Sequence, residues 1–462
     1  MARIAKAKDI AFVGTNAFTG IHIHSEPYIT RTEIYSKISL LESYFQVAIK
    51  NSNTPTKQQN LDKIHSGFVS TRLQLAELIA LEVGKPISQA ISEVDQTSEM
   101  IRHFSNQVRN ISKGRLIKTH AKKSGYRISP LGPIHIIGSS EFPLFDTWKM
   151  AIPNIALGNP ILLRSSQNTP LLGLACQEIF RKANIETVEY CFSDPNDLQY
   201  ILQDSRIHGV LFNGSSNSGK KIAEISGKNL KRAHIETRGN NPFVILEDSD
   251  LNMAVRLAIE GRLLINSGQF GLGPKRFIVH EKLYEKFCER LVEKLESVRI
   301  GDPLNEETDI GPMTSQSSLE KLVGQVLDSV DCGDKILYGG EIHHSVFYKP
   351  TLVEICDLKK SRLWNEDVSG PVFAVRKFKE KEEALRLAND SEYGNIGIVV
   401  GRDLKEAEEF ADKLEVGSVL VNDVVRLGFG LGKGGVKNNG ICSEKFEYPK
   451  EMFANVQTYW IK

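Results

Sequence analysis

The sequence predicts an α/β protein built from buried parallel strands and amphipathic helices. Short apolar runs bounded by Gly, Pro or Asn recur from about residue 131 onwards and alternate with helical stretches. The length of 462 residues predicts two or three domains, at roughly 150 residues each. The apolar share of 41% and the charged share of 25% are typical of globular proteins, which excludes a disordered or fibrous chain.

Helices are predicted first, over residues 61–110. Apolar side chains recur there at helical spacing, and they are Leu75, Leu78, Ile79, Ile87, Ala90, Ile91 and Val94. The run is interrupted at Gly84-Lys85-Pro86, where a glycine followed closely by a proline predicts the end of one helix and the start of the next.

Buried strands follow in two stretches of the chain. Apolar runs predict them at 134–137, 161–163, 209–212 and 243–246, and then at 277–279 and 397–400. A helix after residue 279 carries Tyr284, Phe287, Cys288 and Leu291 on one side, and a charged helix is predicted over 403–414. The basic segment 113–126 fits either a projecting hairpin or a solvated edge.

Charge and cysteine content exclude several classes of function. Fifty-eight basic and 57 acidic residues leave a net charge of +1, so neither nucleic acid nor a membrane is predicted as a partner. No run approaches the ~18 apolar residues of a spanning helix, and Lys6, Lys8 and Asp9 argue against a secretory signal.

The six scattered cysteines form no C-x-x-C pair, which favours a reducing cytoplasm. His343-His344 lacks partner ligands, so a solvated turn is expected there and no metal site is predicted.

A glycine-containing turn at residues 212–219 is the first candidate binding element. It follows a predicted strand and leads into a helix, which places unpaired N–H groups and the positive end of the helix dipole where a phosphate can bind. The segment lacks the G-x-G-x-x-G spacing, so a plain tight turn remains the alternative.

Further short segments occur in a defined order along the chain. They are Asn16-Ala17-Phe18-Thr19-Gly20, Glu141-Phe142-Pro143-Leu144, Gly158-Asn159-Pro160, Glu236-Thr237-Arg238-Gly239, Asn266-Ser267-Gly268-Gln269, Glu366-Asp367 and Gly434-Gly435. In this order and at these separations they resemble the NAD(P)-dependent aldehyde dehydrogenase superfamily, and most closely its succinate-semialdehyde dehydrogenase-like branch. The resemblance runs from about Asn16 to Trp460.

The resemblance implies an aldehyde dehydrogenase-like fold with two Rossmann-like α/β domains and a small oligomerisation arm. The implied cofactor-binding domain comprises residues 1–112 and 131–236, and the implied catalytic-type domain comprises residues 237–440. The arm would comprise residues 113–130 and 441–462. The implied ligands are NAD or NADP and a small-molecule aldehyde, and the implied assembly is a homo-oligomer, either a dimer or a tetramer.

The resemblance also assigns positions around the adenosine diphosphate half of the cofactor. Gly214 and Ser215 match the turn that touches the pyrophosphate, and Trp148 and Lys149 match positions beside the adenosine.

Two further positions bear on the choice of cofactor and one on its nicotinamide half. Arg164 stands where the family has a lysine that reaches the adenosine ribose or a 2′-phosphate, and Gln167 stands where NAD-preferring members have a glutamate. A neutral Gln next to an Arg permits NADP without deciding for it. Asp367 matches the residue that holds the nicotinamide ribose, but it is one methylene shorter than the usual Glu, and Ser369 replaces a common Phe.

The catalytic positions implied by the resemblance depart from the family pattern. Hydride transfer from an aldehyde first needs a tetrahedral adduct, which the family forms with a cysteine thiolate. The cysteine is expected two residues after Gln269, where this chain has Gly271. The oxyanion asparagine is replaced by Glu141, and Arg238 occupies a glycine position. Glu236 matches the general-base glutamate that activates water.

These departures leave three hypotheses of function. The first is a pseudoenzyme with a binding or scaffold role, because Cys176, Cys288 and Ser267 are poor substitutes for the nucleophile. The alternative is an NAD(P)-dependent oxidoreductase that works without a cysteine, with Glu236 or Glu141 activating water so that an aldehyde hydrate donates the hydride. The third is a subunit that pairs with an active paralogue by strand addition.

Overall fold

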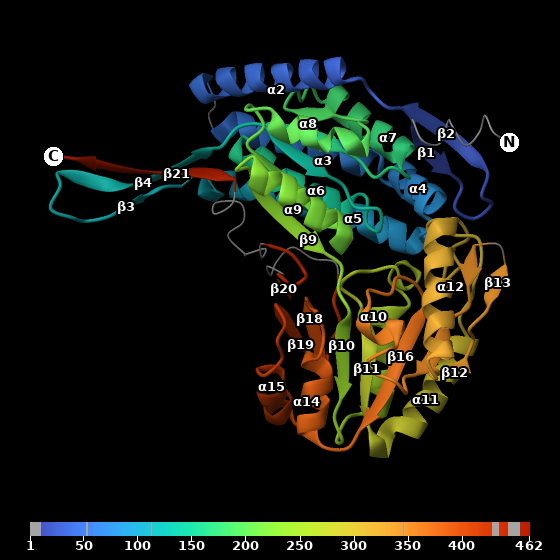
Figure 1. Ribbon diagram of the computed structural model, residues 1–462. Helices are drawn as coiled ribbons and strands as arrows, with labels where there is room; N and C mark the ends of the chain where they lie inside the picture. The colour runs from blue at the N-terminus through green and yellow to red at the C-terminus, as the bar shows by residue number, and fades with distance from the viewer. Residues whose placement is uncertain (1–10, 52–53, 112, 345, 427–433, 442–452) are drawn as a thin grey trace.

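Two sheets form the centres of the two lobes of the molecule, and a narrow third sheet projects from the N-terminal lobe (Figure 1). The computed structural model describes residues 11–51, 54–111, 113–344, 346–426, 434–441 and 453–462. Residues 1–10, which the sequence argues are no secretory signal, lie outside the described residues, as do residues 442–452 of the expected arm.

The N-terminal lobe is built on a five-stranded parallel sheet. Its strand order is β7-β6-β5-β8-β9. The strands are β5 (Ile134–Ile137), β6 (Ile161–Arg164), β7 (Val188–Tyr190), β8 (Gly209–Gly214) and β9 (Arg232–Thr237). The chain runs outward from the central β5 in both directions, so β5 and β8 form the point at which the strand order reverses. Ligands of open α/β sheets bind at such a point, outside the carboxyl ends of the strands.

Helices cover both faces of this sheet because successive side chains of a strand point to opposite faces. Leu163 and Leu211 pack into one core with α3 to α7, whereas Leu162 and Val210 pack into another with α2, α8 and α9. The helices are α2 (Arg31–Asn51), α3 (Thr54–Ser70), α4 (Arg72–Val83), α5 (Ile87–Ile111), α6 (Phe145–Leu157), α7 (Pro170–Lys182), α8 (Leu198–Gln203) and α9 (Ser216–Lys228).

The C-terminal lobe is built on a seven-stranded sheet in the order β12-β15-β16-β11-β10-β18-β19. Its pairs are parallel except for the antiparallel edge pair of β12 and β15. The strands are β10 (Asn241–Ile245), β11 (Pro274–His280), β12 (Lys335–Tyr338), β15 (Thr351–Glu354), β16 (Val372–Phe378), β18 (Ile396–Val400) and β19 (Ser418–Val421).

One face of this sheet packs on α10 and α11, and the other packs on α12 to α15. The helices are α10 (Leu251–Arg262), α11 (Glu281–Glu296), α12 (Gln316–Asp331), α13 (Arg362–Asn365), α14 (Lys381–Asn389) and α15 (Leu404–Ala411). Two-stranded sheets pair β1 (Ala11–Thr15) with β2 (His22–Pro27), β13 (Ile342–His344) with β14 (Phe347–Tyr348), and β17 (Tyr393–Gly394) with β20 (Val436–Lys437).

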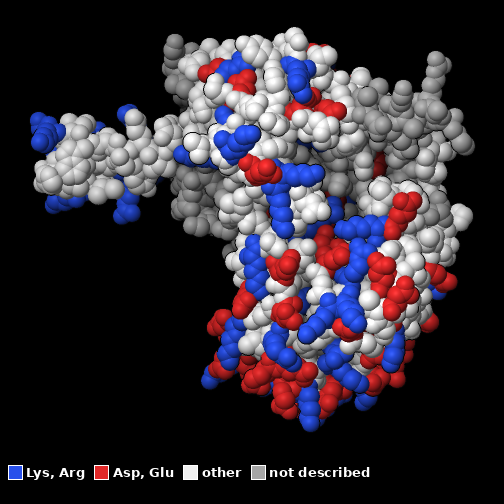
Figure 2. Space-filling model, viewed as in Figure 1, with Lys and Arg blue, Asp and Glu red and all other residues white. Residues whose placement is uncertain are grey.

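The projecting sheet is antiparallel and has the order β21-β4-β3. Its strands are β3 (Arg115–Leu116), β4 (Lys123–Pro130) and β21 (Ala454–Ile461). The hairpin reading of residues 113–126 is therefore the correct one. Segments 113–130 and 454–462 contain Lys and Arg but no Asp or Glu, and the visible charges of the projection are accordingly blue (Figure 2).

The α/β fold predicted from the sequence is confirmed. Each predicted strand is present, and α4 ends at Val83 before α5 begins at Ile87, with Gly84 in the left-handed region at φ 82°. The expected turn at His343-His344 is wrong, because both residues lie in β13. The charged helix expected over 403–414 is shorter and spans Leu404–Ala411. Among the described helices, none is long and apolar enough to cross a membrane.

Candidate nucleotide groove and active site

A groove of about 450 Å³ opens at the carboxyl ends of β5, β6 and β8. Its volume lies within the range of small-molecule sites, roughly 300–1,000 Å³. Ile137 and Gly138 line it after β5, Arg164 ends β6 beside it, and Gly214 ends β8 beside it. This is the point of reversed strand order, where the topology alone predicts a ligand.

The N-terminus of α9 forms one wall of the groove. Ser215 is the N-cap residue, and its hydroxyl oxygen accepts the N–H of Ser218 at 3.3 Å. Both serines and Lys221 line the groove. The N–H groups of the first turn, the helix dipole and a lysine together make this wall suitable for a phosphate. The structure thus brings Gly214 and Ser215 to the groove.

Arg164, the last residue of β6, also lines the groove. Its Nε donates to the carbonyl of Ser193 at 3.1 Å, and its guanidinium lies 4.8 Å from the centre of the Phe12 ring. Its Nη2 is buried and has no hydrogen-bond partner among the described residues. A buried donor without an acceptor costs about 1–3 kcal/mol, so an anionic ligand would be stabilised here. Gln167 also lines the groove and donates to the Tyr28 hydroxyl at 2.7 Å.

Trp148 and Lys149, which the resemblance places beside the adenosine, both lie in α6. The Trp148 indole is 1% exposed and stacks on Phe180 with ring centres 4.9 Å apart. It belongs to the core between α3, α6 and α7, and neither Trp148 nor Lys149 lines the groove. The sequence pattern could not separate the buried side of α6 from the side that faces a ligand.

Lys149 instead contacts Glu236, the expected general base. The Lys149 ammonium lies 3.1 Å from one Glu236 oxygen, and His234 Nε2 lies 2.7 Å from the other. Asn213 also donates to Glu236 at 3.3 Å. Burial alone would raise the pKa of Glu236, but Lys149 and His234 outweigh it and hold that pKa well below its usual range. A carboxylate held in this way is a weak proton acceptor near neutral pH.

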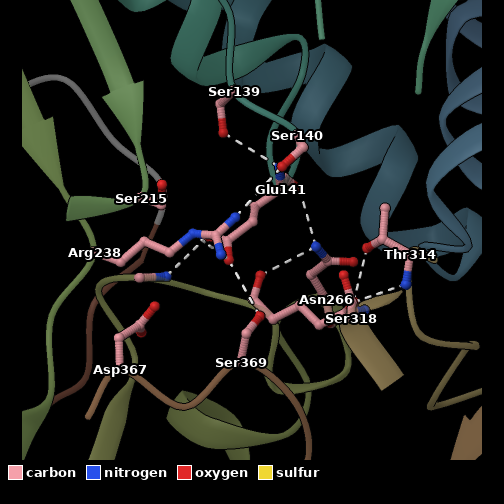
Figure 3. Close-up of polar contacts among 12 residues, drawn as sticks. Ser139, Ser140, Glu141, Ser215, Arg238, Asn266, Thr314, Ser318, Asp367 and Ser369 are labelled. Atoms are coloured by element: carbon pink, nitrogen blue, oxygen red, sulfur yellow. Dashed lines mark hydrogen bonds and ion pairs between the residues drawn. The ribbon is translucent and has the colours of Figure 1, made fainter. Parts of the chain in front are cut away.

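Glu141 and Gly271 meet at the boundary between the lobes. Glu141 lies in the loop between β5 and α6, and one of its oxygens accepts the backbone N–H of Gly271 at 3.1 Å. Its other oxygen lies 3.0 Å from Nε of Arg238 and accepts the Ser369 hydroxyl at 3.3 Å. Figure 3 shows Arg238 and Glu141 pointing toward each other, with Ser369 beside the Glu141 carboxylate. The Glu141 side chain is 9% exposed, so this arrangement is largely shielded from water.

Arg238 covers the backbone of Gly271. A Cβ atom at residue 271 would lie 3.2 Å from Cγ of Arg238 and 3.4 Å from its Cα. Carbon atoms in contact are most stable at about 3.5–4.0 Å, so Arg238 fills the space next to residue 271. Arg238 also lines the groove. Its side chain therefore lies between the groove and Gly271.

Asp367, the expected contact of the nicotinamide ribose, forms an ion pair with Lys275. Lys275 is 1% exposed and also donates to the carbonyl of Gly239 at 2.5 Å. Burial would raise the pKa of Asp367, but Lys275 and Arg238 outweigh it and hold that pKa below its usual range. Asp367 does not line the groove. Sequence reasoning missed Lys275, whose only signal was a lysine at the start of an apolar strand.

A second buried ion pair supports the loop that carries Glu141. Lys85 pairs with Glu93, and Glu93 accepts the N–H groups of Leu144 and Phe145 at 3.0 Å each. The Lys85 ammonium lies 3.5 Å from the centre of the Phe142 ring. These contacts fix the start of α6 and the loop before it. Sequence reasoning missed this pair, although a lysine between Gly84 and Pro86 is a visible signal.

The other candidate nucleophiles are inert in this structure. Burial raises the pKa of Cys176 to about 12 and the pKa of Cys288 to about 12, so both remain protonated thiols. The Ser267 hydroxyl oxygen accepts the N–H of Gly311 at 3.0 Å. The five cysteines that the structure describes are free thiols. Within the described residues, no group of His, Cys, Asp and Glu has the arrangement of a metal site.

Comparison with known proteins gives consistent matches over the whole chain. Residues 5–459 match the sequence profile of the aldehyde dehydrogenase family. An NADP(+) succinate-semialdehyde dehydrogenase from Deinococcus radiodurans is 30% identical over 440 residues, which cover 94% of this chain and 91% of the relative. A succinate semialdehyde dehydrogenase from Escherichia coli that uses NAD(P)+ is 30% identical over 452 residues, covering 97% of both chains.

Solved structures show the same similarity. A succinic semialdehyde dehydrogenase from Streptococcus pyogenes, in complex with NADP+, has a TM-score of 0.94 at 25% identity and matches 98% of this chain and 100% of its own. A glyceraldehyde-3-phosphate dehydrogenase from Methanocaldococcus jannaschii, complexed with NADP, has a TM-score of 0.91 at 28% identity and matches 98% of this chain and 99% of its own.

Proposed function

The chain belongs to the aldehyde dehydrogenase family, and from that premise we propose that it is a pseudoenzyme that binds a nucleotide but does not oxidise aldehydes through a thiol adduct. The observation that carries the proposal is the environment of Gly271. Glycine provides no nucleophile, and the backbone N–H of this residue already donates to the Glu141 carboxylate. Both the bond-forming atom and a donor for the oxyanion are therefore missing from the position at which the family carries out its chemistry.

The replacement of an amide by Glu141 supports the same conclusion. An oxyanion needs hydrogen-bond donors, and the loss of one such donor costs about 10²–10³ in rate. An ionised carboxylate at that place adds electrostatic repulsion. Arg238 compensates for the charge of Glu141, but its side chain also occupies the space above residue 271.

The groove supports binding of NAD or NADP through the adenosine diphosphate end. Its phosphate wall is the start of α9, and Arg164 offers a buried guanidinium donor without a partner among the described residues. The neutral Gln167 beside it permits a 2′-phosphate. These residues would bind and orient the nucleotide. When bound, NAD(P) supplies a hydride acceptor to an enzyme, but this chain positions no group at residue 271 that would form the donor.

The alternative, a cysteine-independent oxidoreductase, receives less support from the site. It needs Glu236 or Glu141 to take a proton from water. The Glu236 pKa lies well below its usual range, with both oxygens occupied, and the Glu141 carboxylate binds Gly271 and Arg238.

A turnover assay distinguishes the two functions. The purified protein is mixed with NAD or NADP and a panel of aldehydes that includes succinate semialdehyde, and the appearance of NAD(P)H is followed by absorbance. We expect no turnover above buffer. Turnover that disappears in an identically purified Glu236→Ala variant would establish the alternative, because a contaminating enzyme would persist in that variant.

We also propose that the projecting sheet joins two copies of the chain. β21 pairs with β4 along one edge, and no described strand pairs with its other edge. Val456 and Trp460 on this strand are 48% and 50% exposed. A long exposed edge strand with apolar side chains is a site for strand addition. Size-exclusion chromatography with light scattering tests the proposal, and a clean monomer at micromolar concentration contradicts it.

A further inference from the structure

The groove is richer in cations than in anions. Its lining includes Arg164 and Lys221 and a single carboxylate, Asp194, while the charge of the lining residue Arg238 is balanced by Glu141. Asp194 is already used locally, because it accepts the N–H of Asn196 at 2.7 Å. The unbalanced positive charge, together with the N–H groups at the start of α9, favours a ligand that carries several negative charges.

The groove also has apolar walls suited to a flat base. Leu198, Phe212 and Ile222 are among the residues that line it. A ligand with a base against these side chains and a diphosphate at α9 uses the groove along its length. Arg164, whose Nη2 lacks a partner among the described residues, would gain an acceptor from the sugar or its phosphate.

The groove ends at Arg238. The Arg238 guanidinium is fixed by Glu141 at 3.0 Å and by the Ser140 hydroxyl at 3.4 Å, and Ser140 lines the same end of the groove. Its aliphatic part lies at contact distance from residue 271. A ring could enter the space between the groove and Gly271 only by displacing this side chain, which would leave the Glu141 carboxylate without its counterion. This end of the groove is therefore closed by a residue that is held in an ion pair.

From these contacts we infer that the ligand of the groove is a nucleoside diphosphate, and that NAD or NADP is held through its adenosine diphosphate end alone. The inference rests on the proposed nucleotide-binding function and adds that the nicotinamide half has no binding site beside residue 271. The affinity for a dinucleotide then equals that for its adenosine diphosphate-ribose part, because the remaining ring makes no buried contact.

Isothermal titration calorimetry of the full chain tests this directly. The probes are ADP, ADP-ribose, NAD, NADP and nicotinamide mononucleotide. We expect ADP-ribose and NAD to bind within about threefold of each other and nicotinamide mononucleotide to give no binding heat. If NAD binds more than about tenfold tighter than ADP-ribose, the inference fails while the proposed nucleotide-binding function stands. If none of the probes binds, both fail.

Substitution of Arg238 gives an independent arm of the test. Removing Arg238 alone leaves Glu141 without a counterion, so Arg238→Gly is made both singly and together with Glu141→Gln. Each variant that retains the far-ultraviolet circular dichroism of the wild type is expected to bind NAD at least about tenfold tighter while its affinity for ADP stays unchanged. Arg256→Ala, on the exposed side of α10, is the matched control and changes neither affinity. Equal changes in the affinities for ADP and for NAD would overturn the inference. If the variants do not fold, the affinities of the wild type for ADP-ribose and NAD decide the question.

Discussion

The Glu141 carboxylate accepts the backbone N–H of Gly271 at 3.1 Å, although 130 positions separate the two residues in the sequence. The bond joins the loop after β5 in the N-terminal lobe to the segment before β11 in the C-terminal lobe. It engages the main-chain donor of the residue at which the family resemblance expects the nucleophile. Arg238 completes the arrangement by pairing with the same carboxylate and covering the same glycine.

Restoring a thiol at residue 271 is expected to be insufficient for activity. In Gly271→Cys the new Cβ would lie 3.2 Å from Arg238 Cγ, and Glu141 would still face the oxyanion. The triple variant Gly271→Cys/Arg238→Gly/Glu141→Asn removes both obstacles and adds an amide donor. We expect it to reduce NADP with succinate semialdehyde about 10²-fold faster than Gly271→Cys alone. The measurement is NADPH absorbance, with Gly271→Ser in the same background as the control. Equal activity of the single and triple variants would contradict this account.

The Glu141–Arg238 pair is expected to show strong coupling in stability. Because both side chains are largely buried, removing one partner leaves an uncompensated charge, which costs about 3–5 kcal/mol. Glu141→Leu and Arg238→Met should each lower the free energy of unfolding by about that amount, whereas the double variant should lie close to the wild type. Urea denaturation of the four proteins measures the coupling. Additive effects of the two substitutions would show that the charges do not depend on each other.

The free energy of unfolding is expected to fall as pH rises from about 4.5 to about 7, in part because of Glu82. Burial raises the pKa of Glu82 to about 7, against the opposing effect of the N–H groups of Leu172 and Leu171. In this window the folded protein binds more protons at Glu82 than the unfolded chain does, so stability decreases with pH and is constant above it. The contribution is up to about 3 kcal/mol.

Glu82→Gln isolates this contribution, because Gln keeps an oxygen acceptor for the start of α7 and does not titrate. The difference between the two proteins is read from paired urea curves at several pH values. Comparison of paired curves is necessary because burial lowers the pKa of His135 to about 4, which acts in the opposite direction between about pH 4 and 6.5. A constant difference across the window would contradict the assignment to Glu82.

Charges on the free edge of β21 are expected to prevent association. Val456→Lys and Trp460→Lys place ammonium groups on exposed positions of an edge strand, which disfavours strand addition. The double variant should elute as a monomer under conditions in which the wild type is larger, with an unchanged circular dichroism spectrum. Leu327→Lys, at a 56% exposed site on α12 in the C-terminal lobe, is the control and should behave as the wild type.

The sequence predicted three strands in the sheet of each lobe, because these buried strands are continuous apolar runs that can be recognised without knowledge of their partners. It also predicted that Glu141, Arg238 and Gly271 depart separately from the family pattern. It could not predict that the three contact one another, because that depends on how the two lobes meet. The packing of Trp148 against Phe180 could not be predicted for a related reason. A tryptophan on an amphipathic helix can pack in a core or line a ligand site, and which of the two it does depends on the neighbouring helices.

The contact between Arg238 and Gly271 bears on whether a single substitution could place a thiol at residue 271. A cysteine that arose alone at residue 271 would press against Arg238, and a glycine that arose alone at residue 238 would leave the carboxylate of residue 141 uncompensated. Each of these two single substitutions is therefore expected to lower the free energy of unfolding on its own. A well-accommodated thiol at residue 271 would require coordinated changes at residues 271, 238 and 141, so substitutions at the three positions are expected to be epistatic.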